Sequence, residues 1–267
     1  MLRPTNRITI SLGRKGSGKS YHAHETQWTA TRLLLLDTLG EHEIPGGVRF
    51  RSLDDLGKAL VHVKAGEPAA RFRFVYTPEG DTSLEEAFWR MAELVRALPN
   101  VLFVVDELGL YVDSHSFDSP AFEEIVRLGR HYGQSFHGLT HRPTDLPKLL
   151  RQGADCMYLF QTHEPDDIDY FARRIGKPAA QALPTLPVWR PGLQPWAPGR
   201  QGAPIVFESG IIVPGRGTEA PVQKSDKKAL DGEEGAVQNT DSTGGSPPAQ
   251  TASPVEEAPA TGEERES

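Results

Sequence analysis

Residues 7–24 read RITISLGRKGSGKSYHAH, in which an apolar strand pattern leads through a glycine-rich turn into a helical pattern. Gly13 to Ser20 fit the pattern G-x-x-x-x-G-K-[ST] at every fixed position. Glycines let such a turn curl so that successive backbone N–H groups point inward at phosphate oxygens, and the N-terminus of the following helix adds a favourable dipole. Because a strand comes directly before the turn and a helix directly after it, the stretch predicts a phosphate-binding loop at one edge of an α/β sheet.

The chemistry of such a loop predicts ATP as its ligand and Mg²⁺ as the metal cofactor. We expect Lys19 to reach the β- and γ-phosphates and the Ser20 hydroxyl to ligate Mg²⁺. The predicted nucleotide-binding residues are Gly13, Arg14, Lys15, Gly16, Ser17, Gly18, Lys19 and Ser20. A glycine-rich strand–helix turn that binds nothing is the alternative interpretation of the same stretch.

A second stretch, VLFVVDE at 101–107, supplies the carboxylates that a phosphate loop needs. Its apolar run predicts a buried strand that ends in Asp106 and Glu107. We predict that Asp106 holds Mg²⁺ through water and that Glu107 polarises the attacking water as a general base. Two adjacent acids favour a nucleotide hydrolase over a small-molecule kinase, in which no water has to be activated. A solvated acidic pair at a strand end is the alternative interpretation.

Strand and helix patterns alternate over most of the chain. Apolar strand patterns recur at 7–12, 32–37, 47–52, 71–76, 101–106, 135–140 and 156–161. Helical patterns occupy 19–30, 53–63, 83–97, 119–132, 145–152 and 165–175. Runs such as LLLL and VLFVV suit strands that are buried on both faces, and the alternation favours a mainly parallel sheet covered by helices. The sequence therefore predicts an α/β fold with a mainly parallel sheet covered by helices; together with the phosphate loop it resembles the three-layer sandwich of the P-loop NTPases.

Composition divides the chain into three predicted parts: an ATPase core at 1–182, a proline- and tryptophan-rich arm at 183–216, and an acidic tail at 217–267. In the arm, PIVFE and GIIVP predict a short strand pair at 204–214. The tail holds 11 acidic and 4 basic side chains with almost no large apolar residues, a composition typical of disorder. Residues 1–216 hold 25 charges of each sign, so they lack the broad basic surface of a passive DNA coat.

Cysteine usage and hydropathy indicate the compartment. The single cysteine, Cys156, excludes an intramolecular disulfide and lies in a stretch typical of a buried strand. The N-terminal stretch has no apolar signal-peptide core. The longest purely apolar runs hold about five residues, far fewer than the ~20 that span a bilayer. We expect a soluble, cytoplasmic protein.

Three further segments carry a family resemblance: LLLLDTLGEHE at 33–43, GRHYGQSFHGLTHRPTDLP at 129–147, and ADCMYLFQTHEPDDIDYF at 154–171. The first resembles a buried strand that ends in a D-x-x-G-E-[HY] turn, which is the second strand of the family named below. The next has an R-x-x-G helix end and a strand that closes in a T-Q-R-P-like turn. The last is similar to a final core strand before an E-P-D-D helix start. In this order, with the phosphate loop and the Asp-Glu strand, they resemble the HerA/FtsK superfamily of DNA-pumping ATPases over residues 8 to about 176.

The resemblance implies a RecA/FtsK-like sandwich that works as a homo-oligomeric ring, a hexamer. Arg130 matches the arginine that a neighbouring subunit inserts into the active site, where it stabilises charge on the transferred phosphoryl group. Arg127 and Arg142 are rival candidates, and a helix-end arginine that complements the dipole is the alternative. His141 stands where the family usually has glutamine. We expect it to sense the γ-phosphate with added pH dependence, or otherwise to cap the strand end.

The core is also similar to the genome-packaging ATPases of tailless, membrane-containing icosahedral viruses, which drive double-stranded DNA into a capsid. That resemblance implies double-stranded DNA as a partner and association with a capsid vertex or a membrane protein. A Zot-like assembly ATPase of filamentous phages, a cellular or plasmid DNA translocase, and a nucleotide-controlled switch remain alternatives. The candidates for DNA contact are the loop at 110–119 and the pairs Arg71/Arg73 and Arg49/Arg51, for which a solvated edge-strand face is the alternative.

Overall fold

The computed structural model describes residues 6–26, 28–79, 83–112, 119–188, 205–208 and 211–213 of the 267-residue chain. The chain divides into two units, Met1–Ala220 and Pro221–Ser267, and every described residue belongs to the first. Most of the predicted arm, the predicted acidic tail and the greater part of the loop at 110–119 lie outside the described residues. The predicted domain boundaries therefore stay predictions.

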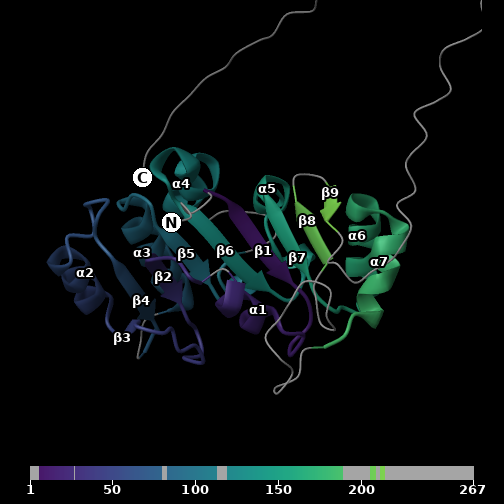
Figure 1. Cartoon of the computed structure of the whole chain (residues 1–267), viewed down its shortest axis with the longest axis horizontal. Helices are drawn as coiled ribbons and strands as arrows, with labels where there is room; N and C mark the ends of the chain where they lie inside the picture. Colours follow the sequence, from purple (N-terminus) through teal and green to yellow (C-terminus); the bar gives the residue numbers. More distant parts are fainter. Residues whose placement is uncertain are drawn as a thin grey trace, which may run out of the picture. The chain divides into compact units, whose positions relative to one another are not determined.

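The described residues form one nine-stranded sheet in the order β3-β4-β2-β5-β6-β1-β7-β8-β9 (Figure 1). The strands are β1 (Ile8–Leu12), β2 (Arg32–Leu36), β3 (Val48–Phe50), β4 (Phe72–Tyr76), β5 (Leu102–Val105), β6 (Ser135–Thr140), β7 (Cys156–Leu159), β8 (Ile205–Glu208) and β9 (Ile211–Val213). Neighbours from β3 to β7 in this order pair in parallel, and β8 and β9 continue the sheet antiparallel. All the predicted strands are confirmed, and the predicted strand pair extends the core sheet because β8 pairs with β7.

Helices connect the strands and cover the sheet. They are α1 (Lys19–Thr26), α2 (Leu53–His62), α3 (Leu84–Arg96), α4 (Pro120–Leu128), α5 (Lys148–Gly153), α6 (Pro165–Ile175) and α7 (Lys177–Ala182), with 3-10 turns η1 (Leu108–Leu110), η2 (Gly129–Tyr132), η3 (Pro143–Asp145) and η4 (Leu183–Thr185). In Figure 1, α2 lies at the β3–β4 end of the sheet, and α6 and α7 lie at the β7–β8 end. The six predicted helices are confirmed in position, although the one predicted at 119–132 divides into α4 and η2, and α7 was not predicted.

Alternate residues of the central strands face two different hydrophobic clusters. Leu34 and Leu36 of β2 pack in a large cluster with buried residues of α2, α3 and α4. Leu33 and Leu35 pack in a smaller cluster with Ala23 of α1 and with Trp28. Because both faces of the strand are buried, its sequence is a continuous apolar run. The predicted three-layer α/β sandwich is therefore confirmed.

The parallel register brings three loops together at one edge of the sheet. Leu12 at the end of β1 pairs with Thr140 at the end of β6, and Val105 at the end of β5 pairs with Gly138 of β6. The residues that follow β1, β5 and β6 therefore share the carboxyl edge, where ligands bind in open α/β sheets. Among the described residues, no helix is long and apolar enough to cross a membrane.

Candidate functional site at the carboxyl edge of the sheet

The phosphate loop joins β1 to α1 and depends on glycine at its first and fourth positions. Gly13 has a φ of 154°, and a Cβ there would lie only 2.7 Å from Cβ of Phe160. Gly16 has a φ of 74°, in the left-handed region that favours glycine. Apart from its two neighbours in the chain, no described residue has an atom within 4 Å of where a Cβ on Gly16 would stand. The loop therefore has a conformation that larger side chains would strain, with open space beside Gly16.

Lys19 is folded back into this loop. Its Nζ donates hydrogen bonds to the carbonyl oxygens of Gly13, at 2.8 Å, and Arg14, at 3.2 Å. Burial lowers the pKa of Lys19 to about 8, and the negative charges of Glu107 and Asp106 oppose that shift. The hydrogen bonds that Lys19 donates thus end on neutral carbonyl oxygens, which an anionic phosphate oxygen would outcompete as acceptors.

Ser17 gives a test of whether the loop fits a nucleotide. Its Oγ is buried and has no hydrogen-bond partner among the described residues. An unpaired buried hydroxyl costs free energy, and phosphate oxygens are the acceptors that such a loop ordinarily provides for. The adjacent Ser20 hydroxyl and the Asp106 carboxylate are oxygen donors of the kind that Mg²⁺ prefers. The residues present therefore fit a magnesium nucleotide.

Glu107 follows β5 in an uncommon backbone conformation. Its φ of 54° and ψ of 48° lie in the left-handed region, which costs free energy for a residue with a Cβ. Its carboxylate is half-buried, and Oε1 lies 2.9 Å from Nε2 of His141. The hydrogen bond from His141 lowers the pKa of Glu107, and this effect exceeds the opposing effect of burial. The structure therefore holds Glu107 ionised and aimed at the loop after β6.

His141 connects Glu107 to the phosphate loop. Its Nε2 faces Glu107, and its Nδ1 lies 3.2 Å from both the carbonyl oxygen of Gly13 and Nζ of Lys19. The hydrogen bond with Glu107 raises the pKa of His141, while burial and the charge of Lys19 oppose that rise. Both ring nitrogens can then donate, Nε2 to Glu107 and Nδ1 to Gly13. The structure brings the predicted residues Lys19, Glu107 and His141 into one network.

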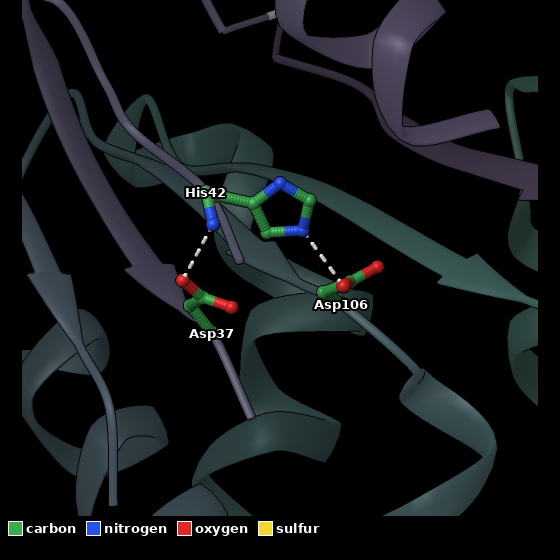
Figure 2. A group of neighbouring side chains, drawn as sticks. All are labelled: Asp37, His42 and Asp106. Atoms are coloured by element: carbon green, nitrogen blue, oxygen red, sulfur yellow. Dashed lines mark hydrogen bonds and ion pairs between the residues drawn. The ribbon is translucent and has the colours of Figure 1, made fainter. Parts of the chain in front are cut away.

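A residue that the sequence did not single out contacts Asp106. Nε2 of His42 lies 2.7 Å from Oδ2 of Asp106, and both side chains are largely buried. Figure 2 shows the imidazole of His42 next to Asp106, with the backbone N–H of His42 directed at Asp37. Burial lowers the pKa of His42, but the hydrogen bond and the nearby acids, Asp106 first, raise it overall. The only sequence signal near this contact is the D-x-x-G-E-[HY] turn at 33–43, which carries part of the family resemblance and predicts no role for His42.

The candidates for the arginine that acts on a neighbour lie at opposite edges of the sheet: Arg127 and Arg130 precede β6, and Arg142 follows it. Arg130, exposed in η2, comes just before β6, and Arg127 pairs with Glu123 of the same helix at 2.7 Å. β6 spans six residues, so at a rise of about 3.3 Å per residue Arg130 lies roughly 17 Å or more from the phosphate edge. In Figure 1 the arrowheads of β1 and β6 point away from α4. The structure does not bring Arg130 to the phosphate site of its own chain. Arg142 follows His141 at that site and pairs with Asp167 at 3.4 Å.

Three of the four arginines considered for DNA contact have partners within the chain. Arg49 donates to Asp37 at 2.8 Å, and Arg73 donates to the carbonyl oxygen of Pro45 at 2.6 Å. Arg51 forms an ion pair with Glu79. Arg49, Arg51 and Arg73 are therefore engaged within the chain, while DNA contact by these pairs stays a prediction.

Two buried histidines lie behind the phosphate loop, and the sequence gave no signal for them. His22 on α1 packs against Tyr158, with ring centroids 4.5 Å apart, and against Phe160, at 5.5 Å. Nε2 of His137 on β6 lies 2.9 Å from Oγ of Ser11 on β1. Burial lowers the pKa of His22 to about 4 and that of His137 to about 3. Both imidazoles are therefore neutral in the folded protein at neutral pH.

Comparison with known proteins identifies the fold. No protein-family model matches the chain, and no curated protein sequence matches it. The genome packaging NTPase B204 of Sulfolobus turreted icosahedral virus 2 in complex with AMP is 21% identical, with a TM-score of 0.57, over 79% of this chain and 98% of that one. Its complex with ATP-γ-S is 20% identical, with a TM-score of 0.58, over 79% and 97%.

A further structure agrees. B204, the DNA-packaging ATPase from Sulfolobus turreted icosahedral virus, is 18% identical, with a TM-score of 0.52, over 79% of this chain and 97% of that one. At these identities the likeness concerns the fold. The chain therefore has the three-layer fold of the B204 NTPases, and nearly the whole length of those proteins is matched.

Proposed function

We propose that the chain is a P-loop ATPase of the HerA/FtsK superfamily that hydrolyses ATP with Mg²⁺ at the carboxyl edge of β1, β5 and β6. The observation that carries the proposal is the network of Lys19, His141 and Glu107, which follow β1, β6 and β5 in the chain and meet beside the phosphate loop. The fold adds support, since it is that of the B204 NTPases, whose structures hold AMP and ATP-γ-S.

Each residue has a task in this mechanism. Lys19 exchanges the carbonyl oxygens of Gly13 and Arg14 for phosphate oxygens, and the unpaired Ser17 hydroxyl gains an acceptor. Ser20 and Asp106 would hold Mg²⁺, which supplies positive charge beside the β- and γ-phosphates. Glu107, held ionised, accepts the proton of the attacking water.

The proposed role of Arg130 requires a second copy of the chain. Because η2 and the phosphate loop lie at opposite ends of β6, Arg130 can serve an active site only on a neighbouring subunit. A contact between opposite ends of identical subunits is heterologous, and such contacts close into rings when the rotation per subunit permits. We propose a homo-oligomeric ring, a hexamer, in which Arg130 stabilises the transferred phosphoryl group of its neighbour.

We further propose double-stranded DNA as the load and genome packaging as the process. The similar B204 structures are described as genome packaging NTPases and a DNA-packaging ATPase, and this chain matches 97–98% of their length. A viral packaging enzyme of this kind would work in the host cytoplasm, at a capsid vertex or beside a membrane protein of the particle. A Zot-like assembly ATPase and a cellular DNA translocase are the alternatives to be separated by experiment.

Steady-state ATP hydrolysis, measured with and without linear double-stranded DNA at low salt, tests the proposal. Lys19→Ala should abolish hydrolysis, whereas Lys58→Ala, an exposed lysine on α2, should leave it unchanged. DNA should stimulate the wild-type rate, and salt should weaken that stimulation because phosphate contacts release counterions. Hydrolysis that survives Lys19→Ala would contradict the assigned site. Hydrolysis that is indifferent to DNA would favour the assembly ATPase over a translocase.

A further inference from the structure

We propose that His42 is a positioning residue that orients the carboxylate of Asp106 toward the magnesium ion. The inference rests on the proposed function, because it assigns Asp106 to the metal. It concerns a histidine of the turn after β2, a segment that supplies no predicted ligand of its own.

The geometry around Asp106 supports this role. Nε2 of His42 donates to Oδ2 of Asp106 at 2.7 Å, so one carboxylate oxygen is engaged and Oδ1 remains for a metal-bound water. The two side chains are only 10% and 7% exposed, so little water competes for the bond. Thr38, in the same turn, directs its hydroxyl at the backbone carbonyl of Asp106, at 3.3 Å. The turn therefore holds Asp106 by its side chain and by its backbone.

The imidazole of His42 is itself fixed in place. Its backbone N–H donates to Oδ2 of Asp37 at 3.0 Å, as Figure 2 shows, and its carbonyl oxygen accepts from Arg49. Arg49 also pairs with Asp37 at 2.8 Å, so the two ends of the turn are tied to one ion pair. The ring of Trp28 meets the imidazole edge-on, with centroids 4.9 Å apart. A donor held in this way can hold its acceptor without a large entropy cost at each turnover.

The contacts favour this role over a direct metal site made of Asp37, His42 and Asp106. One ligand atom from each lies within 4.8 Å of the others, which would allow an ion. However, Asp37 already accepts from two backbone N–H groups and from Arg49. A ring nitrogen that donates a proton to Asp106 has no lone pair for a metal. His42 therefore acts on the metal through Asp106, and such partners of metal ligands typically contribute 10- to 100-fold in affinity.

Mn²⁺ binding tests the proposal without relying on turnover. The full chain is titrated with Mn²⁺ in the presence of AMPPCP, and free Mn²⁺ is measured by electron paramagnetic resonance. His42→Phe keeps a ring beside Trp28 but removes the donor, and it should weaken Mn²⁺ binding about 10- to 100-fold. His42→Gln can place an amide N–H where Nε2–H stands and should retain most of the affinity. His42→Asn, which is too short to do so, should behave like His42→Phe.

A matched control separates this effect from general disturbance of the turn. His24 also packs edge-on against Trp28, at 5.9 Å, and contacts the carbonyl oxygen of Glu43 at 2.9 Å, but it forms no hydrogen bond or ion pair with Asp106. His24→Phe should therefore leave Mn²⁺ affinity unchanged. AMPPCP binding measured without divalent metal should be the same in every variant, because the phosphate loop is untouched.

The outcomes are distinguishable. Equal Mn²⁺ affinity in wild type, His42→Phe and His42→Asn would overturn the role of His42 while leaving the proposed function intact. Equal weakening in His42→Gln and His42→Asn would also overturn it, because the position of the donor would then be irrelevant; this comparison still decides if His42→Phe does not fold. A wild-type chain that binds no AMPPCP would instead overturn the proposed function, and this inference with it.

Discussion

The two buried histidines behind the phosphate loop predict that the protein loses stability in mild acid. A group whose folded-state pKa is depressed binds fewer protons in the folded state than in the unfolded state, so stability falls as pH falls. For His22 the window runs from the unfolded pKa of about 6.5 down to the folded pKa of about 4. For His137 it extends to about 3. Above about pH 8 neither histidine should affect the pH dependence, because both the folded and the unfolded forms are then neutral.

The linkage relation gives the magnitude. Between pH 7 and pH 5 the unfolded imidazole becomes almost fully protonated, while that of His22 stays neutral in the folded protein. Integration gives a loss of about 2 kcal/mol for His22 and a similar loss for His137. Their sum is a substantial part of the roughly 5–15 kcal/mol that stabilises a typical domain. His42 and His141, whose pKa values are raised, act in the opposite direction, since their stabilisation is present below about pH 6.5 and is lost as pH rises.

Comparison of variants isolates the effect from the other titrating groups. His22→Phe keeps an aromatic ring against Tyr158 and Phe160 but removes the titration. Free energies of unfolding are measured by denaturant titration at pH 7 and pH 5, with tryptophan fluorescence as the signal. Wild type should lose about 2 kcal/mol more than His22→Phe over this interval. Phe171→Leu in α6, on the other face of the sheet, should lower stability equally at both pH values.

The reasoning is refuted if His22→Phe and wild type lose the same free energy between pH 7 and pH 5. That result would mean that the imidazole of His22 is protonated in the folded state at pH 5, and therefore that burial does not control its pKa. If the additional loss of unfolding free energy between pH 7 and pH 5 disappeared in both His22→Phe and Phe171→Leu, a general change in the unfolding transition would be indicated instead.

The remaining predictions concern the proposed site. Glu107→Gln should abolish hydrolysis but still bind ATP, measured with a fluorescent analogue, because the side chain acts on water and not on the nucleotide; loss of binding would contradict this. Arg130→Ala subunits should lose about 10³–10⁵-fold in rate alone, yet regain turnover when mixed with Glu107→Gln subunits, and intact mixed rings without turnover would exclude the trans role. His141→Gln should shift the acid limb of the kcat/KM profile to higher pH, because the pKa of Glu107 is no longer lowered by the imidazole; an unchanged limb would assign it to another group. Deletion of 217–267 should leave the ATPase rate unchanged, and a reduced rate would show that these residues take part.

The sequence was sufficient for the fold because its strands carry their own signal. β6 matches its predicted range of 135–140, and α6 matches 165–175. Buried parallel strands read as continuous apolar runs, and the proline after Glu164 together with Gly176 marks the two ends of α6. α7 was missed because its six residues are too few to show a helical period.

The helix predicted at 119–132 shows where a local pattern is overruled by packing. α4 ends at Leu128, and the chain continues as the 3-10 turn η2. A Cβ on Gly129 would lie 3.2 Å from Cβ of Gln134, so the chain turns back closely on itself here. The side-chain amide of Gln134 also donates to the carbonyl oxygen of Leu98, at 3.0 Å. The contact with Leu98 joins residues 36 positions apart, so the local sequence pattern does not indicate it.

The parts of the site that escaped prediction depend on strand order. His42 and Asp106 are 64 positions apart, and they meet because β2 pairs with β5. Ser11 and His137 are 126 positions apart, and they meet because β1 pairs with β6. Sequence motifs identified the residues at each strand end, but which strand ends are neighbours is a property of the assembled sheet. Lys19 and Gly13 are only six positions apart in one motif, so the motif itself predicts that they lie close together.

The histidine at position 141 gives the site a property that glutamine would not. An imidazolium can form an ion pair with Glu107, which lowers the pKa of that carboxylate and makes it a weaker base. A γ-phosphate near Lys19 would compete with Glu107 for the Nε2–H of His141, because it is an anion beside the Lys19 ammonium and the His141 imidazolium. If His141 donated to phosphate instead, the pKa of Glu107 would rise and the carboxylate would gain affinity for the proton of water. Glu107 would then be a stronger base in the nucleotide-bound site than in the site without nucleotide.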